Sequence, residues 1–317
     1  MSSSSDAIKA ALEKGRAAGL SATGGKNADY IPFLALVPSD LFGLAVVTAD
    51  GQTFKTGDAD FAFAIESISK VFTLALVMEE IGPDSVREKV GADPTGLPFN
   101  SVIALELHNG KSLSPLVNAG AIATASLVPG DTADARWNNI LECQCGFAGR
   151  RLKLSNEVNQ SEQTTNFHNR AIAWLLYSAG TCYSDPMEAV DIYTRQCSTL
   201  VTATDLATMG ATLAAGGVNP ISGKRMVSAG NVAPILAEMT MEGLYTASGD
   251  WAYTVGLPGK SGVGGGIMAV VPGELAIAAF SPPLDPAGNS VKAMAAVAAV
   301  ADSLGHNLYT TRGKVSS

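Results

Sequence analysis

Strand-like runs stand near both ends of this 317-residue chain, with a long helical stretch between them. Asp50-Gly51 lies between two β-type runs, which is a strong hairpin signal. Later, "YTVGLPGKSGVGGGIMAVVPGELAIAAFSPP" contains β-rich pieces separated by glycine and by Pro272-Gly273, which indicates two or three antiparallel strands. Because a lone hairpin cannot bury its apolar face, we expect both ends of the chain to share one sheet.

The order of these patterns predicts the organisation of the chain. Residues 1–23 read as a polar leader with one short helical pattern, and residues 24–312 as one domain. Within that domain, residues 24–75 and 201–312 form the expected sheet-containing layer, and residues 76–200 are expected to be mainly helical. Asp185-Pro186 is typical of a helix cap and first turn. The predicted fold is α/β (α+β), a mostly antiparallel central sheet flanked by helices with an inserted helical region.

Composition restricts the class of function. With 47% apolar and 16% charged residues, the chain is expected to fold compactly, and its net charge of -8 argues against a nucleic-acid partner. The first residues lack the apolar core of a secretory signal, and "SVKAMAAVAAVADSLG" is too short to span a bilayer, so we expect a cytoplasmic protein with no membrane partner. Cys143-Gln-Cys145 alone is weak as a metal site, so we expect reduced thiols and neither a metal nor an organic cofactor.

Ser67 and Lys70 open the segment "SISKVFTLALVMEEIG", whose continuation from Val71 is apolar on nearly every face. Such a run predicts a helix buried on most sides, with the two polar side chains on the same side because they are three residues apart. Burial lowers the pKa of a lysine, and a neutral amine could take the serine proton. Backbone N–H groups at the helix start could hold an oxyanion. The alternative is a serine cap beside a lysine that extends to solvent.

A second short motif, Lys260-Ser261-Gly262, begins a strand-like run late in the chain. S-x-x-K followed by K-[ST]-G on a strand is the order found in penicillin-recognising serine enzymes. The glycine would allow a substrate to approach the strand edge, and Lys260 would supply positive potential for a carboxylate. The glycines at 264–266 could instead be only a flexible turn. Together, the two motifs predict a serine acyl-transfer site.

Longer stretches resemble one family, the bacterial-type serine-dependent glutaminases, which are relatives of the β-lactamase and penicillin-binding fold. The resemblance runs from about Asp29 to about Ser303 and is carried by "ADYIPFLALV", "ESISKVFTLAL", "GLPFNS", "PLVNAGAI", "SEQTTNFHNRAIAWLL", "DIYTRQCS" and "GLYTASGDWAYTVGLPGKSGVGGGI". It implies an L-glutamine amidohydrolase that forms glutamate and ammonia through a serine acyl-enzyme. It also implies an intracellular homo-oligomer, a tetramer or a dimer.

The resemblance implies a role for individual residues of this sequence. Ser67 falls on the nucleophile and Lys70 on the general base, and the backbone N–H groups of Ser67 and Val263 are implied to form the oxyanion hole. The substrate-binding set falls on Ser67, Asn118, Glu162, Asn169, Tyr193, Tyr245 and Val263. Lys260 is expected to contribute charge rather than to make bonds.

The chemistry of these side chains agrees with that assignment, although each has a structural alternative. Glu162 and Asn169 would share one face of an unbroken helix, where they could hold the ammonium and carboxylate of an amino acid or simply face solvent. Tyr193 and Tyr245 offer phenols that could pass a proton to leaving ammonia, or could be structural. Asn118 could equally cap a helix over residues 120–125.

Three positions depart from the family pattern. Glu66 stands where glutamine is more usual and puts an extra negative charge beside the site, which could alter the proton affinity of Lys70. Ser114 and His168 replace asparagine and arginine. None is a matched catalytic position, so we expect an effect on kinetics or substrate range rather than on reaction type.

Two other functions remain open at this point. One is a β-lactamase or D-Ala peptidase type of serine acyl hydrolase, whose substrates lie outside the cytoplasm. The other is a catalytically silent protein that binds an amino acid on the same fold. Intact Ser67, Lys70 and Lys260 favour an enzyme over a binder.

Overall fold

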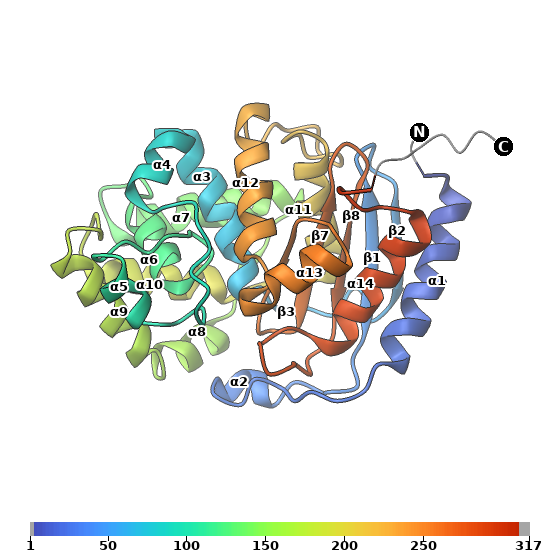
Figure 1. Ribbon diagram of the computed structural model, residues 1–317, viewed down its shortest axis with the longest axis horizontal. Coiled ribbons are helices and arrows are strands. Elements are labelled where there is room, and N and C mark those ends of the chain that lie inside the picture. Colours follow the sequence, from blue (N-terminus) through green and yellow to red (C-terminus); the bar gives the residue numbers. More distant parts are fainter. Residues whose placement is uncertain (1–2, 311–317) are drawn as a thin grey trace.

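The computed structural model describes residues 3–310 and centres on a five-stranded antiparallel sheet in the order β2-β1-β8-β7-β6 (Figure 1). A smaller sheet has the order β3-β5-β4. The strands are β1 Gly43–Thr48, β2 Thr53–Gly57, β3 Phe63–Ala64, β4 Lys153–Leu154, β5 Thr199–Val201, β6 Gly259–Ser261, β7 Gly266–Val271 and β8 Leu275–Phe280. Strands from both ends of the chain therefore share one sheet, as expected.

Helices surround this sheet and form the inserted region. They are α1 Ser5–Ser21, α2 Pro32–Ala35, α3 Ser69–Ile81, α4 Pro83–Lys89, α5 Ile103–Leu107, α6 Asn118–Ser126, α7 Ala133–Ala148, α8 Asn156–Gln163, α9 Phe167–Ser178, α10 Pro186–Cys197, α11 Ala203–Ala214, α12 Ala229–Glu242, α13 Ser248–Thr254 and α14 Val291–Leu304, with 3-10 turns η1 Glu66–Ile68 and η2 Tyr245–Ala247. Within the described residues, no helix is long and apolar enough to cross a membrane.

Both faces of the central sheet are buried. Strand β1 is buried at every residue. Because successive side chains of a strand point to opposite faces, both faces of β1 are covered. Leu44 and Val46 pack with α1 and α14, whereas Ala45 and Val47 belong to the larger core that includes α3, α7 and α11. Figure 1 shows α3 and α12 standing between the sheet and the helical region. This position places the start of α3 at the junction of the two parts.

The local patterns that predicted turns and caps are confirmed. β1 and β2 pair antiparallel around Asp50-Gly51, and β7 and β8 pair across Pro272-Gly273. The Asp185 side chain accepts the N–H groups of Met187 and Glu188 and begins α10. These elements were predictable because their signals lie within a few neighbouring residues.

Two possibilities that the sequence left open for its helices do not occur in the structure. The helix expected to carry both Glu162 and Asn169 is broken between α8 and α9, where Thr164 turns its hydroxyl back onto the Gln160 and Ser161 carbonyls. Asn118 does not cap α6 with its side chain, because it is the first helical residue and Val117 precedes it as the cap residue. Its amide is therefore free for other partners.

The segment expected as a polar leader contains α1, which packs tightly against α14. Ile8 and Leu12 are buried, and a Cβ at Gly15 would lie 2.5 Å from Val300 Cγ2. Glycine is needed at this position because the two helices approach too closely for a side chain. The domain limits at residues 23 and 24 stay a prediction, and residues 311–312 of the expected domain lie outside the described residues.

A matched pair of leucines on α1 tests whether this helix is part of the stable fold. Leu12 is 4% exposed and Leu20 is 46% exposed. Leu12→Ala is expected to lower the free energy of unfolding by about 2–4 kcal/mol, because it removes buried methyl groups, whereas Leu20→Ala should cost less than about 1 kcal/mol. Urea unfolding measures both values. Equal, small losses would show that α1 contributes little to stability.

Candidate active site

Ser67 lies in the 3-10 turn η1, immediately before α3, and is 6% exposed. The preceding residue, Glu66, has φ = 50°, a left-handed conformation that costs energy for any residue except glycine. Tyr245, whose phenol interacts with the Ser67 hydroxyl, has φ = 57°. Two non-glycine residues in this conformation at one place indicate that packing holds the serine in a fixed geometry.

Glycines of the β6–β7 turn bring Val263 close to Ser67. A Cβ at Gly262 would lie 2.8 Å from the Ile65 carbonyl oxygen, and one at Gly264 would lie 2.3 Å from the Ala64 carbonyl oxygen. The turn therefore runs against the segment that leads into η1, an approach that only glycine permits. The turn thus carries Val263, which is 7% exposed, to the mouth of α3.

Lys70, one turn into α3, is almost completely buried at 1% exposure. Its Nζ donates to the Leu116 carbonyl at 3.2 Å and to Asn118 Oδ1 at 2.8 Å. Burial lowers the pKa of this amine to about 8. The alternative of a lysine that extends to solvent is therefore excluded.

The two hydrogen bonds of Lys70 determine what its amine can do. A neutral amine has two N–H groups and one lone pair. Because carbonyl oxygens of Leu116 and Asn118 take both N–H groups, the lone pair is left to accept a proton. The bonds described for Lys70 do not include one to Ser67, whose hydroxyl instead interacts with Tyr245.

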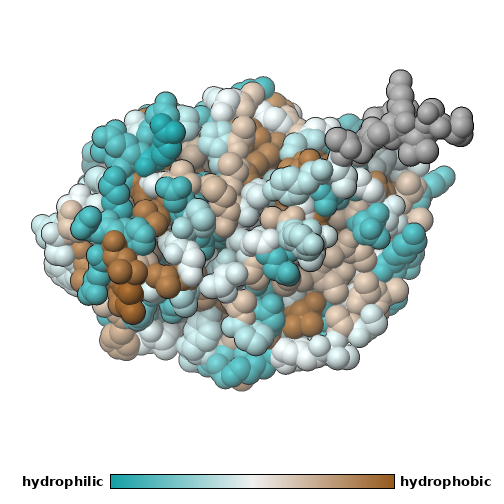
Figure 2. Space-filling view, in the orientation of Figure 1, coloured by the Kyte–Doolittle hydropathy of each residue, from teal (hydrophilic) through white to brown (hydrophobic). Residues whose placement is uncertain are grey.

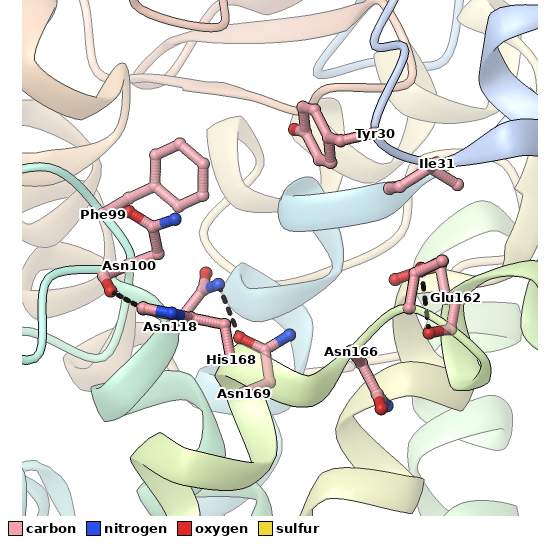
Figure 3. A pocket seen from close by; sticks show the side chains of 10 residues that line it. Tyr30, Ile31, Phe99, Asn100, Asn118, Glu162, Asn166, His168 and Asn169 are labelled. Atoms are coloured by element: carbon pink, nitrogen blue, oxygen red, sulfur yellow. Dashed lines mark hydrogen bonds between the residues drawn. The ribbon is translucent and has the colours of Figure 1, made fainter.

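Asn118 connects the lysine to a cavity of about 260 Å³ (Figure 3). Its Oδ1 also accepts from the Tyr193 hydroxyl at 3.1 Å, and its Nδ2 donates to Asn169 Oδ1 at 3.0 Å. Asn118, Glu162 and Asn169 all line this cavity, despite the break between α8 and α9. The structure thus joins four of the sequence-predicted residues, Lys70, Asn118, Asn169 and Tyr193, in one hydrogen-bonded chain.

Lys260 is placed differently from what its motif suggested. It is fully buried and does not line the cavity, and its Nζ donates to the carbonyls of Gly243 and Ser261 at 2.9 and 2.6 Å. Burial and the nearby Lys70 lower its pKa well below the usual value. Its Nζ also lies 4.4 Å from the centroid of the Tyr245 ring. These contacts connect β6 to the end of α12 and place the amine of Lys260 against Tyr245. A role for the charge of Lys260 stays a prediction.

A buried pair of carboxyl groups lies beside the serine. Glu66 and Glu162 form a cluster with Cys197 in which the ligand-type atoms lie within 4.8 Å of one another. Burial and the Glu162 charge raise the pKa of Glu66 well above its usual value, and burial raises that of Glu162 to about 8. Two adjacent buried carboxyls cannot both ionise cheaply, so Glu66 keeps its proton and donates a hydrogen bond to Glu162.

The same three groups are of the types that bind metals, but their protonation does not suit a metal. Burial and the two carboxyls raise the pKa of the Cys197 thiol, and metal ligands must be deprotonated. A neutral carboxyl and a neutral thiol are poor ligands. The cluster therefore fits proton sharing better than metal binding.

Sequence reasoning missed several residues of the cavity. Tyr30, Ile31, Phe99 and Asn100 line it, and the Phe99 ring lies 4.6 Å from that of Tyr245. A signal was available, because "ADYIPFLALV" and "GLPFNS" carry the family resemblance and contain these residues. His168 also lines the cavity, with Nε2 2.6 Å from the Asn100 carbonyl oxygen.

An antiparallel sheet flanked by helices, with a buried serine and lysine at the start of α3, is the β-lactamase-like arrangement that this chain shares with solved glutaminases. The Glutaminase family model matches residues 25–309. The chain therefore belongs to the glutaminase family and is an enzyme of that family, as the resemblance implied.

Individual relatives agree with this assignment. A glutaminase of Brucella abortus (strain S19) is 99% identical over 317 residues, which is 100% of both chains. The solved structure of a probable glutaminase, ybaS, has a TM-score of 0.96 and 63% identity and covers 98% of this chain and 100% of its own. Mglu in its glutamate form has a TM-score of 0.88 and 34% identity, covering 96% of this chain and 70% of its own.

Proposed function

We propose that this protein hydrolyses the side-chain amide of L-glutamine to glutamate and ammonia through an acyl-enzyme on Ser67. Lys70 takes the serine proton, and the serine oxygen attacks the amide carbon. The backbone N–H groups of Ser67 and Val263 would stabilise the oxyanion. Ammonia leaves with a proton from Lys70, Tyr193 or Tyr245, and water then cleaves the ester as the same base works in reverse.

The protonation states support Lys70 rather than a tyrosine as the base. Burial raises the pKa of both Tyr193 and Tyr245, so each phenol keeps its proton at neutral pH and serves as a donor. Lys70, with a pKa of about 8, is neutral in about one molecule in ten at pH 7. The pKa of the amine thus lies near the working pH, which suits a general base.

The cavity walls support a free amino acid as the substrate. Burial raises the pKa of Glu162 to about 8, and an ammonium group beside it would lower that pKa and so stabilise the carboxylate that binds it. The amides of Asn118 and Asn169 offer donors for a carboxylate. Mglu, a relative, has been solved in a form described as its glutamate form. Glutamate is the product that the proposed reaction leaves in the site.

The observation that carries this proposal is the hydrogen-bonded path from Lys70 through Asn118 to Asn169, since it joins a buried base to the wall of an amino-acid-sized cavity. The test is to supply the purified protein with glutamine, asparagine or a chromogenic β-lactam and to measure product. Ammonia from glutamine supports the proposal. Cleavage of the β-lactam alone would favour the penicillin-recognising class, and no product from any of them would favour a silent binder.

Glu66→Gln tests the proton shared with Glu162. In wild type, loss of the Glu66 proton at alkaline pH would break the bond to Glu162 and lower kcat/KM. Glutamine offers an N–H donor that cannot ionise, so this alkaline limb of kcat/KM is expected to move to higher pH. Because folding raises the pKa of Glu66, the wild-type fold loses stability as pH rises above the usual value of 4.5. The variant, which has no such group to ionise, should therefore gain unfolding free energy relative to wild type as the pH rises above 4.5. Identical pH profiles would contradict a shared proton.

We also propose a cytoplasmic homo-oligomer, a tetramer or a dimer. The four cysteines are free and buried, which suits a reducing compartment. Large apolar side chains are exposed on two adjacent helices: Ile103 and Leu107 on α5, and Phe167, Trp174 and Tyr177 on α9. Figure 2 shows apolar colour gathered over α5, at the lower left of the molecule. Such a patch is typical of a subunit interface, and light scattering measures the mass that decides it.

A further inference from the structure

A second cavity, of about 270 Å³, lies among α3, α4 and α12. The two cavities have no lining residue in common. In Figure 1, α4 and α12 flank the upper part of α3. Much of the wall of this second cavity is apolar and is formed by Met78, Val86, Pro115, Pro234 and Met241. A cavity of this size and character accommodates a small molecule with a short hydrocarbon chain.

Two acidic residues line this cavity, the exposed Asp84 and the buried Glu238. Glu238, on α12, is 3% exposed, and its Oε2 accepts a hydrogen bond from Ser114 Oγ at 2.8 Å. Its Oε1 takes part in none of the hydrogen bonds found among the described residues. Burial, with added repulsion from Glu242 and Asp93, raises the pKa of Glu238 to about 7. Glu242 and Asp93 do not line the cavity, but their charges act on Glu238 from nearby. Together with the uncommitted oxygen of Glu238, they favour a cation over an anion in the cavity.

The arginine at the mouth of the cavity does not supply that cation. Arg87 pairs with Asp84 at 3.4 Å, and their side chains are 72% and 92% exposed. A pair this exposed is solvated and screened. Repulsion, rather than attraction, dominates the charges that act on Glu238.

We propose that this second cavity is a binding site for a short aliphatic primary ammonium ion. The ammonium N–H groups would bond to Glu238, and the hydrocarbon chain would lie against the apolar wall. The negative charge of Glu238 and of its acidic neighbours Glu242 and Asp93 disfavours an anion. A neutral alcohol of the same length would bury the chain equally well but would leave the carboxylate without a counter-charge.

The segment of residues 114–116 connects this site to Lys70 through hydrogen bonds. Ser114 donates to Glu238 and accepts the Leu116 N–H at 3.1 Å, and the Leu116 carbonyl accepts from Lys70. Pro115, between them, lines the second cavity. An ammonium ion would keep Glu238 ionised, strengthen its bond to Ser114 and so hold Leu116 against the amine. Its positive charge would also favour the neutral form of Lys70.

Binding is tested by calorimetry with n-butylammonium, with n-butanol as the uncharged probe. We expect the amine to bind wild type at least about tenfold more tightly than the alcohol, and to lose about that factor in Glu238→Gln. Ala237→Phe should abolish binding by filling the cavity, whereas Ala233→Phe, one turn away and outside the lining, should not. Thermal melting confirms that each variant is folded. Equal binding of alcohol and amine, or unchanged binding in both Glu238→Gln and Ala237→Phe, would overturn the proposal.

The effect on the active site is measured separately, so that failure of the glutaminase proposal cannot be confused with failure of this one. Calorimetry needs no turnover and reports the ammonium site alone. With n-butylammonium bound, kcat/KM for glutamine near neutral pH should rise about threefold in wild type and stay unchanged in Glu238→Gln. Binding without any change in kcat/KM would overturn the connection through Ser114 and Leu116. Inhibition that competes with glutamine would place the amine at Glu162 instead.

Discussion

Ser67→Ala is expected to lower kcat for glutamine by about 10⁴-fold or more, because it removes the atom that attacks the substrate. The binding groups Glu162, Asn118 and Asn169 stay in place, so the affinity for glutamine should change by less than about tenfold. Ammonia release measures the first quantity, and calorimetry with glutamine measures the second. A variant that keeps a tenth of the wild-type rate would exclude Ser67 as the nucleophile.

Ser69 provides the matched control for that experiment. It is also a buried serine at the start of α3, but its hydroxyl donates to the Glu66 carbonyl at 2.6 Å. Ser69→Ala therefore removes this bond and a weaker contact with Cys197 Sγ at 3.7 Å, but no reacting atom. We expect it to cost stability of about 1 kcal/mol and to retain most of the activity. A loss as large as that of Ser67→Ala would point to disruption of the helix start rather than to lost chemistry.

Lys70→Met is expected to lower kcat by about 10³-fold or more, since methionine fills the same buried space but cannot accept a proton. Lys70→Arg should be similarly inactive, because a guanidinium keeps the charge and does not deprotonate. The pair therefore separates a base from a simple positive charge. The acid limb of the wild-type pH profile, which Lys70 with its pKa of about 8 would set, should be absent from the residual activity of both variants.

Retention of activity in Lys70→Arg would contradict the assignment of Lys70 as the base. Circular dichroism and thermal melting distinguish lost chemistry from lost folding. This distinction matters because the Leu116 carbonyl and Asn118 Oδ1 lose their donor when lysine becomes methionine. A folded, glutamine-binding, inactive Lys70→Met protein is the expected result.

Features of the fold that depend on neighbouring residues could be predicted from the sequence. Asp50-Gly51 specifies its hairpin because its turn geometry is local, and Ser290 caps α14 by accepting the N–H of Ala293, three residues later. The shared sheet followed from a physical requirement, since neither terminal hairpin could bury its own face. The break between α8 and α9 could not be predicted from periodicity, which carries no information about the Thr164 and Thr165 hydroxyls that bond back to carbonyls of α8.

The candidate site was only partly predictable for a related reason. Ser67 and Lys70 lie one turn apart, so their proximity and the burial of Lys70 followed from the helix pattern. The partners of Asn118 could not be read from the sequence, because Lys70, Tyr193 and Asn169 reach it from three other helices. Periodicity within one helix carries no information about which helices meet.

Partitioning of the reaction between water and hydroxylamine tests the acyl-enzyme most directly. If glutamine and a γ-glutamyl ester both form the same ester on Ser67, the ratio of γ-glutamyl hydroxamate to glutamate should be identical for the two substrates at each hydroxylamine concentration. The common intermediate has lost the leaving group, so it cannot distinguish its origin. Ratios that differ between the two substrates, or glutamate formed without any hydroxamate, would contradict a covalent intermediate on Ser67.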